Sequence, residues 1–236
     1  MPGDPLRSAR SRRSRNAWRG RPHCWAATDV VTILNALGID KAHVAGHSFG
    51  ADIALEMVTR VSDRVLSATL LEALFAQTEA MQQGLKDLGV AMSLIADKYT
   101  NGDVDGAVTT FWEFTSEVEG LAEIIEPVLP EGPPVSSLLW IWAPGSMSTC
   151  RPWANWMADP AAVKDIAKPI AWIGATDSAP MFAESRSLLQ QWLPTTGASD
   201  IAGVGHYFPV LRPADTATAL DELLRTQTPA RLGAQT

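Results

Sequence analysis

The 236-residue sequence contains few cysteines and no long apolar run. Its two cysteines, Cys24 and Cys150, lie far apart and neither belongs to a CxxC pair, which excludes a disulfide framework and a cysteine-based structural zinc site. No apolar stretch reaches the roughly 18 residues of a membrane-spanning helix. The N-terminus contains Arg but lacks the apolar segment of a secretory signal. We therefore expect a cytoplasmic protein that needs no cofactor or metal ion and does not contact a membrane.

Tyrosine is also scarce, with two residues against nine Trp, and the charge is unevenly spread. Residues 1–25 carry seven Arg and a single acidic residue, Asp4, so the remainder of the chain is strongly acidic. An acidic body does not favour binding to nucleic acid, and we expect none. Because residues 1–25 have no helix or strand period and few aliphatic side chains, we interpret them as a disordered Arg-rich arm.

Apolar periodicity divides the rest of the chain into an α/β part and a helical insertion. Short buried-strand runs alternate with helical stripes over residues 26–75 and 166–227, which predicts a parallel sheet covered by helices on both faces. Residues 76–165 carry helical stripes, the first ending at Gly89, and no convincing strand. We therefore predict one discontinuous α/β domain, a helical cap at 76–165 and a tail at 228–236. The strands are expected at 42–45, 65–71, 170–173 and 200–202.

The segment Gly46-His47-Ser48-Phe49-Gly50 has the pattern GxSxG. It follows one predicted strand and precedes a predicted helix. In that setting the pattern is typical of a nucleophilic serine on a sharp turn, which requires small neighbours such as Gly46 and Gly50. The alternative interpretation is an ordinary glycine-rich turn between a strand and a helix.

A nucleophilic serine needs a base, and the sequence offers four histidines. His23 lies in the arm, His43 lies within a strand, and His47 stands beside Ser48, where we expect its side chain to point elsewhere. His206 follows the last predicted strand, in a glycine-containing loop that can reach the carboxyl edge of the sheet. It is the candidate base, and a histidine on a surface loop is the alternative.

A carboxylate would orient that imidazole and stabilise its charged form. Asp177 follows the strand at 170–173 and fits the chain order Ser, Asp, His. Its alternative role is to cap the helix that begins near Pro180. Glu72 ends the preceding strand in an equivalent position and is the rival candidate for the acid.

From Ala26 to about Arg225 the sequence resembles the α/β-hydrolase superfamily with a helical cap. Three stretches carry the resemblance: LGIDKAHVAGHSFGADIALEMVTRVSDRV, KPIAWIGATDSAP and GVGHYFPVLRP. It implies Ser48 as nucleophile, His206 as base, Asp177 as acid and the Phe49 backbone N–H as one oxyanion donor. In some members of the family the acid stands at the end of the preceding strand, the position that Glu72 occupies here. The resemblance further implies hydrolysis of a small, partly apolar ester, thioester or related acyl compound.

The sequence departs from that family at its N-terminus. The family's core begins upstream of the serine turn with several strands and a His-Gly loop that supplies the second oxyanion donor, and residues 1–25 resemble neither. We therefore expect the strand before Ser48 to lie at an open sheet edge. We also hypothesise that residues 1–25 derive from a wrong start or a shifted reading frame. The alternative function is that of an impaired hydrolase fragment that binds a ligand or partner without turnover.

The cap supplies candidate pocket residues. Trp153, Trp156 and Met157 lie in a Trp-rich stretch and would line an apolar substrate pocket, although packing within the cap is an equally good explanation.

Overall fold

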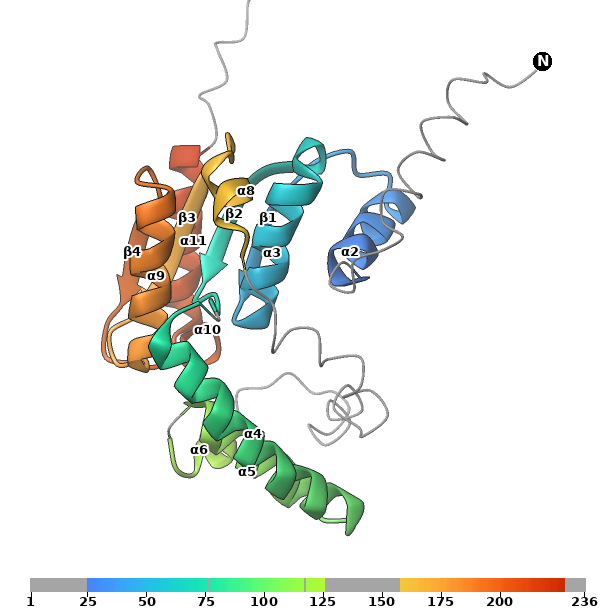
Figure 1. Ribbon diagram of the computed structural model, residues 1–236, viewed down its shortest axis with the longest axis vertical. Coiled ribbons are helices and arrows are strands. Elements are labelled where there is room, and N and C mark those ends of the chain that lie inside the picture. Colours follow the sequence, from blue (N-terminus) through green and yellow to red (C-terminus); the bar gives the residue numbers. More distant parts are fainter. Residues whose placement is uncertain (1–24, 76, 117, 126–157, 228–236) are drawn as a thin grey trace, which may run out of the picture.

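The computed structural model describes residues 25–75, 77–116, 118–125 and 158–227 (Figure 1). At its centre is a four-stranded sheet in the order β1-β2-β3-β4, with every neighbouring pair parallel. Each strand overlaps a predicted run, although β4 begins three residues before the predicted stretch 200–202. Their bounds are β1 Ala42–His47, β2 Val65–Leu71, β3 Ile170–Ala175 and β4 Gly197–Ile201.

Helices cover both faces of this sheet, as the α/β alternation predicts. Helix α3 (Phe49–Arg60) packs on β1 and β2, and α9 (Pro180–Trp192) packs on β3. Helix α11 (Pro213–Gln227) contacts β2, β3 and β4 and lies behind the sheet in Figure 1. The remaining elements of this part are α2 Trp25–Ala36, η1 Ser62–Arg64, α8 Pro160–Lys164 and α10 Phe208–Leu211.

Consecutive strand residues contribute to different cores, because side chains alternate across a strand. Leu70 and Trp172 belong to the larger apolar cluster, which includes buried residues of α3 and α9. Leu71 and Ile173 belong to a second cluster with Phe208 and residues of α11. The two clusters fix the register of β2 against β3, so the carboxyl ends of these strands lie together at one edge.

Strand β1 lies at an edge of the sheet. Among the described residues it pairs with β2 alone, as we expected for the strand before Ser48. Its burial alternates accordingly: Val44 is half-buried against the larger core, whereas His43 and Ala45 are exposed.

The described part of the insertion is helical, and its first helix is longer than predicted. Helix α4 runs from Glu79 to Thr100 and continues through Gly89, where we expected it to end. A glycine inside a helix costs only about 1 kcal/mol relative to alanine. The apolar face continues beyond it, since Ile95 is buried against Ala107 and Val108 of the next helix. The free energy gained from this packing exceeds the cost of the glycine, so the helix continues beyond Gly89.

Helices α5 (Val104–Ser116) and α6 (Leu121–Ile125) complete the described insertion. Figure 1 shows them beside α4, extending away from the end of the sheet at which the strand arrows point. None of the helices in the described ranges, the 22-residue α4 included, is both long and apolar enough to cross a membrane.

Near its far end the predicted cap meets the core. Ala158 and Val163 lie within the stretch assigned to the cap, yet both are buried in the larger apolar cluster beside β3 and α9. Helix α8 therefore packs on the α/β part. The arm except Trp25, which begins α2, and the candidate pocket residues Trp153, Trp156 and Met157 lie outside the described residues.

Candidate active site

Ser48 occupies a strained turn between β1 and α3. Its φ of 56° and ψ of −126° lie in a region that costs non-glycine residues about 1–3 kcal/mol. Two backbone hydrogen bonds hold the turn: the Ser48 N–H donates to the Leu71 carbonyl at 2.8 Å, and the Ala51 N–H donates to the Ser48 carbonyl at 2.9 Å. Residual strain of this kind is typical of a functional position, and it is what the GxSxG pattern predicts.

The two glycines of the motif are not equivalent. A Cβ at Gly46 would collide with the carbonyl group of Gly50, so the turn cannot close around a larger residue there. A Cβ at Gly50 would meet no heavy atom within 4 Å. The requirement for small neighbours therefore applies to Gly46, and our expectation that it also applies to Gly50 was wrong.

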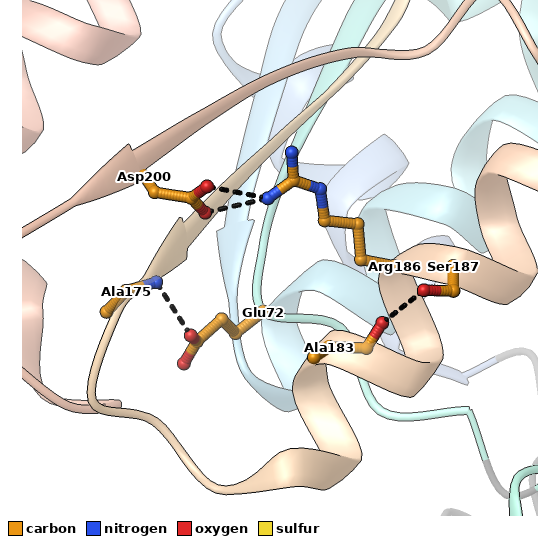
Figure 2. Close-up of polar contacts among 6 residues, drawn as sticks. All are labelled: Glu72, Ala175, Ala183, Arg186, Ser187 and Asp200. Carbon is orange, nitrogen blue, oxygen red and sulfur yellow. Dashed lines mark hydrogen bonds and ion pairs between the residues drawn. The ribbon is translucent and has the colours of Figure 1, made fainter.

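His206 is buried, and its Nδ1 lies 2.6 Å from Oε2 of Glu72. The Glu72 side chain is 1% exposed, and its Oε1 accepts a hydrogen bond from the Ala175 N–H at 3.0 Å (Figure 2). Both carboxylate oxygens are thus engaged. Glu72 itself adopts a φ of 51°, and its N–H donates to the Ile173 carbonyl at 3.1 Å.

Asp177 lies apart from this pair. Its side chain is exposed, and its Oδ1 accepts a hydrogen bond from the Thr176 hydroxyl at 2.8 Å. Its backbone N–H donates to the Val204 carbonyl, which ties the turn to the loop before His206. The residue at the N-cap of α9 is Ala179, and no side chain caps that helix end. The structure therefore brings Glu72, and not Asp177, to the imidazole of His206.

Two aromatic rings flank the His206 imidazole. Phe182 of α9 stacks on it, with ring centroids 4.2 Å apart and an interplanar angle of 14°. The ring of His47 lies 4.4 Å from it at 33°. His47 also reaches the His206 backbone, with its Nε2 at 2.8 Å from the carbonyl oxygen. The printed contacts of the His47 side chain are thus with the His206 segment and not with Ser48, and sequence reasoning did not foresee this partner.

The histidine beside Ser48 therefore connects the serine turn to the His206 loop. In the described part of the chain no hydrogen bond joins the Ser48 hydroxyl to His206; the contact between the two segments is made by His47, the residue before Ser48. In active sites without substrate, hydrogen bonds between a nucleophile and its base are often long or poorly aligned and tighten in the complex. Phe49, the expected oxyanion donor, is the first residue of α3.

A buried carboxylate lies behind the serine turn. Asp52 in the first turn of α3 is 3% exposed, and its Oδ1 accepts a hydrogen bond from the Leu74 N–H at 2.8 Å. Burial raises the pKa of Asp52 well above its usual value; the Leu74 hydrogen bond opposes this shift, and the nearby charge of Glu56 adds to it. The bond fixes the turn that carries Glu72. Sequence reasoning missed Asp52, since nothing in the helical pattern marks it as buried.

The cap contacts the loop that carries His206. The Thr115 hydroxyl of α5 and the Tyr207 hydroxyl lie 2.7 Å apart. Burial raises the pKa of Tyr207, and the hydrogen bond with Thr115 opposes that shift. The end of α5 therefore packs directly beside the candidate base.

Two other features near the sheet edge are separate from this site. Arg186 of α9 reaches across β3 to both carboxylate oxygens of Asp200, each at 2.8 Å, and so links α9 to β4 (Figure 2). A groove of about 470 Å³ lies between α9 and the start of α4, and none of the candidate site residues lines it. In the described ranges, no group of three or more His, Cys, Asp or Glu side chains is arranged to hold a metal ion.

Comparison with known proteins settles the family. The model of the alpha/beta hydrolase family matches residues 5–219. The chain belongs to the α/β-hydrolase family. The match begins within the segment that we interpreted as an Arg-rich arm.

Individual relatives are more distant. The protein RutD of Azorhizobium caulinodans, whose name provisionally describes a carbamate hydrolase, is 40% identical over 45 residues, which are 19% of this chain and 17% of that protein. The chain therefore spans less than a fifth of the length of this curated relative.

Solved α/β-hydrolase structures share the fold. MGS-M2, an α/β-hydrolase enzyme from a Medee basin deep-sea metagenome library, superposes with a TM-score of 0.62 at 15% identity, over 89% of this chain and 73% of that one. The meta-cleavage product hydrolase CumD of Pseudomonas fluorescens IP01 gives a TM-score of 0.62 at 15% identity, over 89% and 74% of the two chains. At these identities the similarity establishes the fold alone.

Proposed function

We propose that this α/β-hydrolase is a serine hydrolase that acts on a small, partly apolar ester, thioester or related acyl compound. Ser48 is its nucleophile and His206 its base. Glu72 takes the part of the acid in place of Asp177, the first candidate from the sequence. The observation that carries the proposal is the buried 2.6 Å contact between Glu72 Oε2 and His206 Nδ1, together with the strained turn of Ser48.

The proposed reaction begins with attack of Ser48 Oγ on the acyl carbon, while Nε2 of His206 accepts the hydroxyl proton. The imidazolium then gives this proton to the leaving oxygen or sulfur as its bond to the acyl carbon breaks. Water, deprotonated by the same imidazole, then attacks the acyl carbon; the bond to Ser48 Oγ breaks, the imidazolium returns its proton to Oγ, and the carboxylic acid leaves. The Phe49 N–H donates to the oxyanion that develops on the acyl oxygen in both steps.

The setting of Glu72 supports its role as the acid. A carboxylate stabilises an adjacent imidazolium more strongly in a buried site than in water, because the local dielectric constant is lower. Glu72 is 1% exposed, and the Ala175 N–H orients its second oxygen. Because Nδ1 donates to the carboxylate, the neutral tautomer leaves Nε2 unprotonated and able to accept a proton. Asp177 is exposed and pairs with Thr176, which disfavours it for the same role.

The names of similar proteins are compatible with acyl chemistry. RutD is provisionally named as a carbamate hydrolase and CumD as a meta-cleavage product hydrolase, and both names describe hydrolytic reactions. The apolar ring of Phe182, which stacks on the His206 imidazole, favours a substrate with an apolar part.

A fluorophosphonate probe tests the nucleophile. We expect the probe to label the folded wild-type protein on the peptide that contains Ser48, located by mass spectrometry, and Ser48→Ala to remove the label. The matched control is Ser62→Ala, which changes an exposed serine of η1 and should label as the wild type does. If the folded wild type neither labels nor hydrolyses activated esters, the proposal fails and a protein that binds without turnover is favoured.

Substrate preference can be read from a series of p-nitrophenyl esters and acyl thioesters of increasing chain length. We expect kcat/KM to increase from acetyl to medium acyl chains, because each buried methylene contributes about 0.8 kcal/mol. Equal kcat/KM values along the series would contradict the apolar part of the substrate assignment.

A further inference from the structure

His47 makes two contacts with the candidate base, although its own position in the chain is beside the nucleophile. Its Nε2 lies 2.8 Å from the His206 carbonyl oxygen, and its ring centroid lies 4.4 Å from that of His206. The His47 ring also makes edge contacts with Phe208 and Tyr207, at centroid distances of 5.7 and 6.5 Å.

The hydrogen bond identifies the tautomer of His47. A backbone carbonyl can only accept, so Nε2 of His47 must carry the proton that it donates. The ring needs no second proton for this bond. Burial, followed by the neighbouring His206, lowers the pKa of His47 to about 4, while the bond to the His206 carbonyl opposes that shift. His47 is therefore a neutral donor at neutral pH.

The His206 imidazole is thus held on several sides. Phe182 covers one face of the ring, His47 lies near it on a different element, and Glu72 engages Nδ1. The remaining ring nitrogen is Nε2, the atom to which the proposed function assigns proton transfer. Its direction depends on how firmly the loop around Gly205 and Tyr207 is fixed.

We propose that His47 is a positioning residue that holds the His206 loop through its N–H donation to the His206 carbonyl and through contact between the two rings. This inference rests on the proposed function, because it assigns His47 a part in directing the base toward Ser48. A displacement of about 1 Å in such a group can reduce a rate by about 100-fold. Since His47 adjoins Ser48 in the chain, one rigid turn fixes nucleophile and base together.

Two substitutions separate the hydrogen bond from the ring. His47→Phe keeps an aromatic ring but cannot donate, whereas His47→Gln places an amide N–H near the position of Nε2. We expect His47→Phe to lower kcat for an activated ester by about 10- to 100-fold with KM nearly unchanged, and His47→Gln to stay within about fivefold of the wild type. The control is His43→Gln, an exposed histidine of the same strand that contacts Ser67, which should leave kcat unchanged.

The inference is overturned if His47→Phe retains wild-type kcat, or if Phe and Gln reduce kcat equally. A wild type that does not label at Ser48 would instead overturn the proposed function, so the two failures are distinct. A measurement on the unmodified protein covers the case in which His47→Phe does not fold. We expect ¹⁵N NMR to show His47 as the neutral Nε2–H tautomer between pH 5 and 8; the Nδ1–H tautomer or a cation at pH 6 would overturn the assignment.

Discussion

The turns after β2 and β3 leave the same edge of the sheet, and each carries a carboxylate within two residues of its strand. The turn after β2 is buried: Glu72 has a φ of 51°, Asp52 holds the Leu74 N–H, and both oxygens of Glu72 have partners. The turn after β3 is exposed, and Asp177 pairs with its neighbour Thr176. The difference shows that burial and backbone direction, more than order in the chain, determine which carboxylate reaches the imidazole.

The largest effect is expected from a pair of isosteric substitutions, one in each of the two turns. We expect Glu72→Gln to lower kcat for an activated ester by about 10³- to 10⁴-fold, because the amide no longer stabilises the imidazolium. Asp177→Asn should remain within about threefold of the wild type, since its side chain faces solvent. Steady-state kinetics of the two purified variants give the answer. Loss of activity in Asp177→Asn alone would restore Asp177 as the acid.

The serine turn contains a similar contrast between a crowded position, Gly46, and an open one, Gly50. Gly46→Ala should lower the free energy of unfolding by about 3 kcal/mol or more, because the new methyl group meets the Gly50 backbone, which has little freedom to move. Gly50→Ala should leave stability equal or raise it by up to about 1 kcal/mol, since alanine favours helix α3. Urea unfolding of both variants measures the difference, and equal effects would contradict the packing described for Gly46.

The buried turn should also respond to pH through Asp52. Because its folded-state pKa is raised, the native state retains the Asp52 proton above pH 3.8, where the unfolded chain releases it, so this group lowers stability as pH rises. Asp52→Asn keeps an oxygen to accept from Leu74 and removes the titration. We expect the stability of this variant relative to the wild type to increase between pH 4 and pH 8. The stability of both proteins is measured by urea unfolding. If the difference in the free energy of unfolding between variant and wild type does not change with pH, burial does not raise the pKa of Asp52.

The smallest effect belongs to the exposed turn. Thr176→Val removes the hydroxyl that donates to Asp177 and accepts from the Gly203 N–H. We expect a loss of about 0.5–1 kcal/mol in the free energy of unfolding and no change in kcat. A kcat decrease comparable to that of Glu72→Gln would mean that this turn takes part in catalysis.

The first three strands could be predicted from the sequence because each is a short apolar run between turns, whereas β4, with the sequence GASDI, is mostly polar or small and its start was missed. The end of α4 could not be predicted, because the contact of Ile95 with Val108 involves residues that are close only in the folded chain. Local pattern predicts an element well and its length less well when another helix supplies the burial.

The serine turn was predicted by a motif whose spacing reflects its geometry, and His206 was selected because the other histidines had competing positions. The choice between Glu72 and Asp177 stayed open because both follow neighbouring strands, and the positive φ of Glu72 has no signature in the residue type. The contacts of His47 and Asp52 depend on loops far away in the sequence, His206 and Leu74, so no local pattern indicates them.

The most direct test of the Glu72–His206 pair is ¹H NMR of the proton on Nδ1 of His206. A hydrogen bond to a buried carboxylate moves this proton far downfield and protects it from exchange. We predict that the signal is present in the wild type and in Asp177→Asn and absent in Glu72→Gln. A signal that persists in Glu72→Gln and disappears in Asp177→Asn would contradict the account.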